Sequence, residues 1–188
     1  MKKFKKIIAL GLATMAAVSS MSMSASAMTE IYDEAGENIW YVYTKEDLKD
    51  GIVPGMMSTF ATFPMTSTQP TYDDARNLAS SDISQSFSLN ARNIKYSKSW
   101  YGSGSNFGVF FNDFSSNATN FTVSIYEVDA DDDLYLVSTG KYNAADVIGF
   151  GYPNLSKSGR YCLKITNNTA STVTGSPIIT NNIKKFFN

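Results

Sequence analysis

The sequence predicts an all-β protein whose main part is an antiparallel, jelly-roll-like β-sandwich. Short apolar runs with period-two alternation recur through the second half of the chain, and clusters of Gly, Asn, Asp and Ser separate them at even spacing. Helical periodicity is absent. The 188 residues, 43% of them hydrophobic and 13% aromatic, are enough to bury a core without disulfides or metals.

The first element is predicted to be a secretory signal peptide over residues 1–27. Four lysines precede an uncharged, largely apolar run at 7–18, and the segment ends in the A-x-A pattern of residues 25–27. The apolar run is shorter than the roughly 20 residues of a membrane span. We therefore expect cleavage after Ala27, a secreted extracellular product, and no membrane span in the mature chain.

Residues 28–82 are predicted to form an irregular N-terminal arm. It contains one convincing strand at 39–44, followed by a short helical turn capped by Thr44 and a second brief helix at 73–78. The large apolar residues between Met56 and Tyr72 favour an arm packed on the domain over a free linker.

Residues 83–188 are predicted to form the β-sandwich domain. Its strands are expected at 85–89, 93–101, 106–112, 120–128, 134–138, 147–152, 159–167 and 173–180. The residues that alternation places on one face should form its core. They are Phe87, Phe107, Val109, Phe111, Phe121, Val123, Ile125, Tyr161, Leu163 and Ile165.

Composition and charge exclude several classes of function. Without histidine and with Cys162 as the one cysteine, the chain has no His-based catalytic triad, no internal disulfide and no Cys- or His-based zinc site. Residues 1–27 carry four of the 16 lysines and arginines and none of the 17 acidic residues, so the rest has a formal net charge of −5. That sign disfavours nucleic acid or an anionic membrane surface as a partner.

Two strings resemble the bacterial pre-peptidase carboxy-terminal (PPC-type) domains. They are the D-L-Y-L of residues 133–136 and the alternating strand GRYCLKITN of residues 159–167. The resemblance covers about half of the mature chain. It implies a small extracellular β-sandwich, in a family whose acidic loops have been interpreted as calcium-binding, substrate-docking or secretion-assisting. No protease domain precedes these strings here, which departs from the usual family context.

The acidic loop Asp129, Asp131, Asp132 and Asp133 is a candidate calcium site between two strands. Hard cations need several oxygen ligands, and alternating aspartates offer them, although the glycine and glutamate of an EF-hand loop are missing. The alternative is a solvated hairpin loop, because Asp is itself a turn residue.

A candidate ligand site is formed by Tyr96, Trp100, Tyr101 and Asn106. Flat aromatic rings beside a polar amide are suited to carbohydrate. The alternative interpretation makes Trp100 an anchor of the core.

No catalytic residues are assigned. Alternation places Cys162 on the face of Arg160 and Lys164, as an inert strand residue, and no sequence rule pairs Asp113, Glu127 and Asp146 as glycosidase carboxylates. The sequence thus favours a non-catalytic binding or adhesion module for an extracellular polysaccharide, cell-wall polymer or cell-surface protein. The alternatives are a small secreted carboxylate-dependent hydrolase and a structural or interaction protein with no small ligand.

Overall fold

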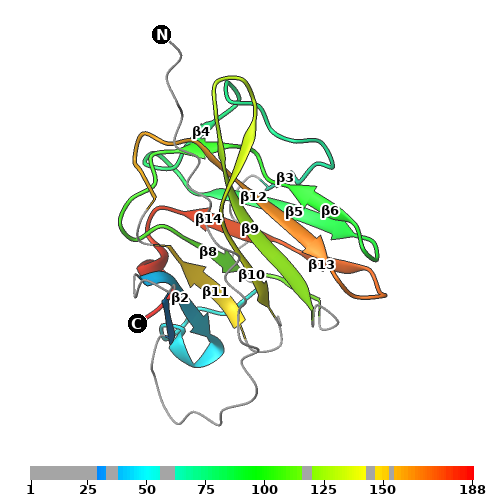
Figure 1. The fold of residues 1–188 in the computed structure, drawn as a ribbon. Coiled ribbons are helices and arrows are strands. Elements are labelled where there is room, and N and C mark those ends of the chain that lie inside the picture. The colour runs from blue at the N-terminus through cyan, green and yellow to red at the C-terminus, as the bar shows by residue number, and fades with distance from the viewer. Residues whose placement is uncertain (1–28, 33–37, 56–61, 116–119, 143–146, 153–154) are drawn as a thin grey trace.

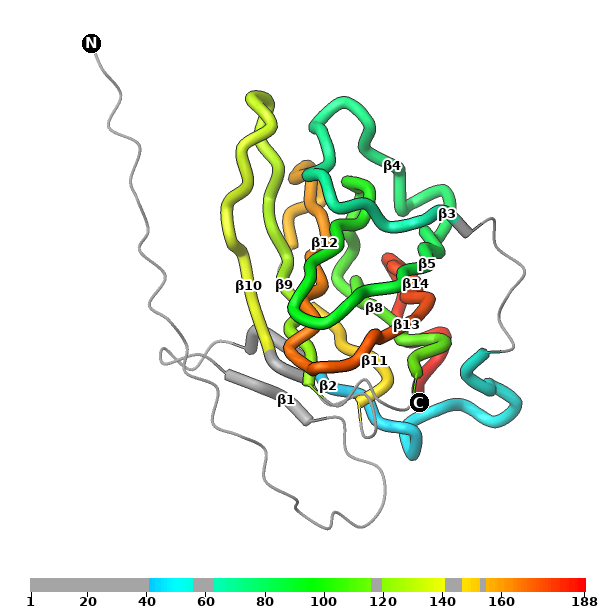
Figure 2. The backbone as a smooth tube through the Cα atoms, turned by 90° about the vertical axis from the view of Figure 1, so that its right-hand side faces the viewer, coloured from blue at the N-terminus to red at the C-terminus, as the bar shows by residue number. Residues whose placement is uncertain are grey.

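The protein is an all-β sandwich of two facing sheets, seen from two sides in Figures 1 and 2. The computed structural model describes residues 29–32, 38–55, 62–115, 120–142, 147–152 and 155–188. The predicted signal peptide lies outside them. In the described part of the chain, no helix is long and apolar enough to cross a membrane.

The larger sheet has the strand order β1-β2-β11-β8-β14-β5-β13, with β3 paired to β5. Its strands are β1 (Thr29–Tyr32), β2 (Asn38–Thr44), β3 (Thr62–Pro64), β5 (Ile83–Leu89), β8 (Gly108–Phe111), β11 (Val147–Gly151), β13 (Val173–Gly175) and β14 (Pro177–Thr180). The smaller sheet has the order β10-β9-β12-β7-β4, with β6 paired to β12. Its strands are β4 (Arg76–Asn77), β6 (Ile94–Tyr96), β7 (Trp100–Tyr101), β9 (Phe121–Val128), β10 (Leu134–Tyr142) and β12 (Tyr161–Asn167).

The predicted core is confirmed, since all ten residues proposed from alternation are buried in one cluster between the sheets. In the central pair of the smaller sheet, Ile125 lies opposite Leu163 and Val123 lies opposite Ile165. Such same-face pairs stabilise a sheet, and their burial fixes its register because a one-residue slip would turn them to solvent. Figure 2 shows β10, β9 and β12 in one layer and β8, β14 and β5 in the other.

The segment 28–82 supplies strands to both sheets and is not an irregular arm throughout. β2 pairs with β11, β3 with β5, and β4 with β7. The strand expected at 39–44 is present as β2, and the turn after Thr44 is the 3₁₀ helix η1 (Lys45–Asp47). The second helix expected at 73–78 is wrong, because the Arg76 N–H donates to Ser99 at the start of a parallel pairing with β7.

Two predicted strands are interrupted in the structure. The run 93–101 divides into β6 and β7, because the Ser97 hydroxyl accepts the Leu163 N–H and the Lys98 N–H turns to the Gln85 side chain. The run 173–180 divides before Pro177, which lacks an N–H and stands first in β14. Both pieces pair with β5.

A second core covers the outer face of the larger sheet and was not predicted. The C-terminal segment, with the 3₁₀ helix η2 (Ile183–Lys185), lies across β8, β11 and β14. The fully covered residues are Tyr43, Phe110, Ile148, Ile178, Ile183, Phe186 and Phe187. A Cβ atom at Gly149 would lie 2.8 Å from the Phe187 ring, so the absence of a side chain there allows the close approach.

Candidate functional site

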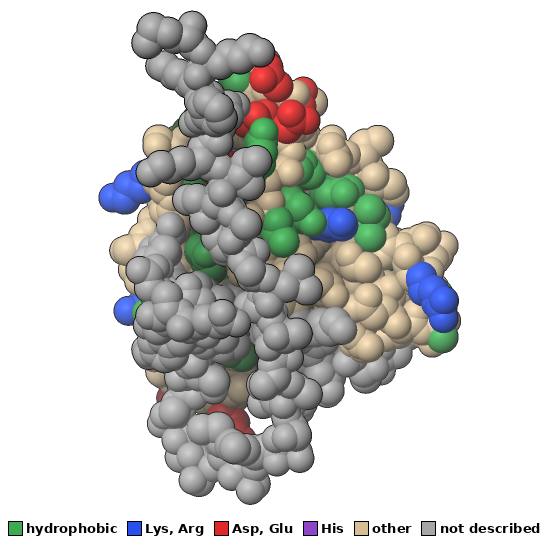
Figure 3. Space-filling view, viewed as in Figure 1, with side chains coloured by type: hydrophobic (Ala, Val, Ile, Leu, Met, Phe, Trp, Pro, Cys, Tyr) green, Lys and Arg blue, Asp and Glu red, His purple; other side chains and the backbone are tan. Residues whose placement is uncertain are grey.

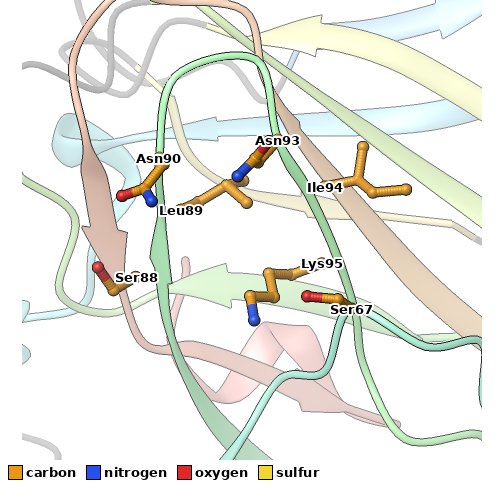
Figure 4. A pocket seen from close by; sticks show the side chains of 7 residues that line it. All are labelled: Ser67, Ser88, Leu89, Asn90, Asn93, Ile94 and Lys95. Carbon is orange, nitrogen blue, oxygen red and sulfur yellow. The ribbon is translucent and has the colours of Figure 1, made fainter.

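A cavity of about 300 Å³ opens where the chain passes from the larger sheet to the smaller one, at the turn between β5 and β6 (Figure 4). This volume is at the lower end of the roughly 300–1,000 Å³ that is typical of small-molecule sites. Seven residues line it, and all are labelled in Figure 4: Ser67, Ser88, Leu89, Asn90, Asn93, Ile94 and Lys95.

The turn itself is defined by its backbone. The Asn93 N–H donates to the Asn90 carbonyl at 3.1 Å, and Arg92 between them has a positive φ of 59°. Arginine in this left-handed region is unusual, because the conformation favours Gly or Asn. The turn presents the side-chain amides of Asn90 and Asn93, both exposed, at one end of the cavity (Figure 4).

Asn167, at the end of β12, is completely buried and hydrogen-bonds to the backbone of this turn. Its Nδ2 donates to the carbonyls of Leu89 at 3.0 Å, Asn90 at 3.2 Å and Ser171 at 2.7 Å. Its Oδ1 accepts from the N–H and hydroxyl of Thr169. Because this one side chain joins the β5–β6 turn to the loop of residues 169–171, tertiary contacts fix the turn in addition to its own hydrogen bond.

The other end of the cavity carries a positive charge. Thr66 bridges to Tyr96 in antiparallel fashion, which makes Ser67 and Lys95 neighbours, and their side chains lie side by side in Figure 4. Lys95 is half-buried and makes no salt bridge within the described residues. None of the seven lining residues is acidic. The cavity therefore combines amides, hydroxyls and one ammonium with the apolar Leu89 and Ile94.

The structure does not bring Tyr96, Trp100, Tyr101 and Asn106 together on one surface. Trp100 and Tyr101 are consecutive residues of β7 and point to opposite faces. Trp100 is 0% exposed, stacks on Phe107 at 5.5 Å between ring centroids and donates its Nε1–H to Ser103. The alternative interpretation of Trp100 as a core anchor is the one that the structure supports.

Tyr101 is exposed beside Arg160, just before β12, whereas Tyr96 is only 6% exposed, belongs to the buried cluster and packs beside Lys164 of β12. The Lys164 ammonium lies 5.7 Å from the Tyr96 ring and 5.6 Å from the Tyr126 ring. The Arg160 guanidinium lies 5.7 Å from the ring of Tyr101, which is 37% exposed. Figure 3 shows apolar side chains around a basic one over β9, β12 and β6. The faces of these rings are therefore already in contact with cations of the protein itself, which argues against a shared carbohydrate-binding platform.

Asn106 lines a separate, smaller cavity of about 150 Å³, together with Tyr41, Tyr152 and Lys184 among others. Its backbone carbonyl accepts the Ile183 N–H, which ties it to the C-terminal segment. This volume is well below the usual range for ligand sites. We therefore take the cavity at the β5–β6 turn as the stronger candidate.

The acidic loop is a hairpin turn at the tip of β9 and β10, where acidic side chains gather in Figure 3. The Asp129 carboxylate accepts the N–H groups of Asp131 and Asp133, at 2.9 and 3.0 Å. Asp132 has a φ of 65°, and its carboxylate accepts the Tyr72 N–H. Within the described ranges, no three His, Cys, Asp or Glu side chains group in a way that could hold a metal ion. Repulsion by Asp129 raises the pKa of the exposed Tyr135 phenol.

The nucleophile and acid candidates lie apart from both cavities. Cys162 is completely buried, and burial raises the pKa of its thiol to about 12 against a partial lowering by Lys164, which fits an inert strand residue. Asp113 and Glu127 are exposed and line neither cavity. Asp146 lies outside the described residues.

Sequence reasoning missed Asn90, Asn93, Lys95 and Asn167. A local signal existed, because N-A-R-N between two alternating runs is a turn pattern. The role of Asn167 has no local signal, because its bonds to Leu89 and Asn90 span 78 and 77 residues.

No family model matches the chain, and no curated protein matches it. Among solved structures, the crystal structure of Yersinia pseudotuberculosis-derived mitogen (YPM) is similar at 11% sequence identity, covering 53% of this chain and 84% of that chain, with a TM-score of 0.38. A likeness at this level carries no inference about function. The resemblance to pre-peptidase carboxy-terminal domains is not tested by these comparisons and stays a prediction.

Proposed function

We propose that the protein is an exported, non-catalytic saccharide-binding module and that its site is the cavity at the β5–β6 turn. The observation that carries the proposal is the composition of the lining. Asn90 and Asn93 offer amide donors and acceptors, Ser67 and Ser88 offer hydroxyls, and Leu89 belongs to an apolar wall. A sugar presents hydroxyl groups and an apolar C–H face, which this mixture matches.

The same lining favours binding over hydrolysis. Acid–base catalysis needs groups that exchange protons, and glycoside hydrolysis ordinarily needs two carboxylates. The seven lining residues include no carboxylate and no thiol. The predicted signal peptide supports the proposal further, because export would bring the site to extracellular polysaccharides.

Rigidity of the turn also supports a binding role. Asn90 and Asn93 sit on a turn whose carbonyls are held by Asn167, so little ordering of the backbone remains to be done when a ligand arrives. Sites that are ordered in advance lose less entropy on binding, which raises the affinity for a given set of contacts.

The proposal is tested by a glycan-array screen with the secreted protein, followed by calorimetry on the saccharides that bind. We expect the double variant Asn90→Ala/Asn93→Ala to bind at least about tenfold more weakly, because two side-chain amides are lost. Asn182→Ala, an exposed asparagine in the C-terminal segment, serves as the matched control and should bind normally. Melting curves verify that the double variant is folded. If no saccharide binds, or if the double variant binds as well as the wild type, the proposal is wrong.

A further inference from the structure

We propose that the ligand of this cavity is an anionic saccharide whose acidic group contacts Lys95. The inference rests on the proposed function and narrows it to one chemical class. It starts from the position of the lysine, which lines the cavity beside Ser67 with its side chain half-buried.

Among the described cations without a side-chain partner, Lys95 stands apart because it is half-buried. Lys45, Arg92, Lys157 and Lys184 show no such partner either, but all four are exposed. Lys185 pairs with Asp82, Lys49 donates to the Lys184 carbonyl, and Arg160 donates to the Tyr72 carbonyl and stacks on its ring. Lys98 and Lys164 lie over aromatic rings. Within the same described residues, no ion pair, hydrogen bond or ring contact of the Lys95 ammonium is found. Its charge is left for a group that comes from outside.

The surroundings of Lys95 favour a negative group. A ligand that fills the cavity would remove water from the Lys95 ammonium, which is costly unless a counter-charge or hydrogen bonds compensate. No acidic residue lines the cavity, and Arg92 adds a second positive charge in the same turn. This local excess stands out in a chain that carries a net charge of −5 after residue 27. Attraction between such a local field and an anion aids both encounter and affinity.

The cavity also has a direction. The amides of Asn90 and Asn93 lie at the turn end, whereas Lys95 of β6 and Ser67 of the segment between β3 and β4 lie at the other end (Figure 4). A ligand with hydroxyl groups at one end and an acid at the other satisfies both ends. Lysine acts as a point charge without the planar fork of arginine, so a carboxylate, a sulfate and a phosphate are all compatible with it. The shared chemistry is therefore a sugar that bears an anionic substituent.

The test uses a panel in which each neutral saccharide is paired with its uronic acid, its sulfate ester and its phosphate ester. Binding to the wild-type protein is measured by calorimetry at low and moderate salt. We expect at least one anionic form to bind about tenfold or more tightly than its neutral partner, since a charged hydrogen bond is gained. The preference should weaken with added salt. The three acidic arms identify which anion the site takes.

Variants then assign the preference to the lysine. Lys95→Met keeps the length of the side chain and should abolish the preference for the anionic form while neutral saccharides still bind. Lys95→Arg should retain most of it. Lys157→Met removes an exposed lysine beyond the opposite end of β12 and should leave the preference unchanged. If neutral and anionic partners bind equally, or if Lys95→Met keeps the preference, the anion inference fails while the proposed function stands. If no saccharide of any charge binds, the proposed function itself fails.

Discussion

Replacing Phe187 by alanine is expected to destabilise the folded protein by about 4 kcal/mol, within the range of about 3–5 kcal/mol that buried Phe→Ala changes cost. Phe187 is 1% exposed, its ring stacks on Tyr43 at 4.2 Å between centroids, and it meets Phe110 edge-on at 5.7 Å. Removing the ring leaves a cavity over Gly149, which has no side chain to fill it. Backbone contacts on both sides of Phe187, such as the Lys49 N–H to the Phe186 carbonyl, hold the segment in place and limit collapse.

Thermal and urea unfolding measure this loss. For a domain of this size, 4 kcal/mol corresponds to a melting temperature lower by about 12 °C. Leu136→Ala is the matched control, because Leu136 is 50% exposed on β10 and its truncation should change the stability by no more than about 0.5 kcal/mol. A loss below about 1 kcal/mol for Phe187→Ala would show that the C-terminal segment does not seal the larger sheet in solution.

Three further predictions concern buried or acidic groups. The thiol of Cys162 should not react with a thiol reagent in the native protein. Its pKa is about 12 in the folded state against the ordinary 9.0, so above pH 9 the unfolded chain loses the thiol proton first. The free energy of unfolding should therefore be constant below pH 9 and decline as the pH rises towards 12. Near pH 10.5 the decline is about 2 kcal/mol, which urea unfolding should detect in the wild type and find reduced in Cys162→Ala. Millimolar calcium or a chelator should leave the melting curve unchanged. Asp129→Ala should lower the free energy of unfolding by about 1 kcal/mol, because the Asp129 carboxylate accepts two N–H groups of the turn. Asp131→Ala should lower it by less than half of that. Asn167→Asp should lower the free energy of unfolding by about 3 kcal/mol or more, because three backbone carbonyls would then lie next to a carboxylate instead of an amide donor. An unchanged melting curve for Asn167→Asp would contradict the role of Asn167 in holding the turn.

The core of the sandwich could be predicted because burial on one face leaves a period-two trace in the sequence. Phe121, Val123 and Ile125 alternate with polar residues, and each lies in the core. The rule also explains the difference between Trp100 and Tyr101, since adjacent strand residues cannot share a face. Applied to that pair, it would have argued against one aromatic platform.

The second core could not be predicted in the same way. Phe186 and Phe187 are consecutive residues near the C-terminus and show no alternation, yet both are buried, because one packs on Phe110 and the other on Tyr43. Their partners come from β8 and β2, far away in the chain. The consecutive apolar residues of these strands are visible in the sequence, but only the tertiary structure shows that the C-terminal segment covers their second face.

The candidate site is also assembled from distant segments. Ser67 comes from the segment before β4, Asn90 and Asn93 from the β5–β6 turn, and Asn167 beneath them from β12. The sequence pattern indicates a turn at Asn90 and Asn93. It gives no sign that Lys95 of the next strand and Ser67 of an earlier segment line the same cavity.

The central claim is that this cavity binds a saccharide, and mapping of backbone amide resonances during a saccharide titration tests it most directly. The probe is the saccharide that binds best in the paired panel, added to the isotope-labelled protein. We predict that the amide signals of Ser67 and of residues 88–95 shift in a saturable manner, with those around Asn167 next. Shifts confined to the smaller cavity around Asn106 and Tyr152, or to the outer face around Tyr126 and Lys164, would contradict the claim.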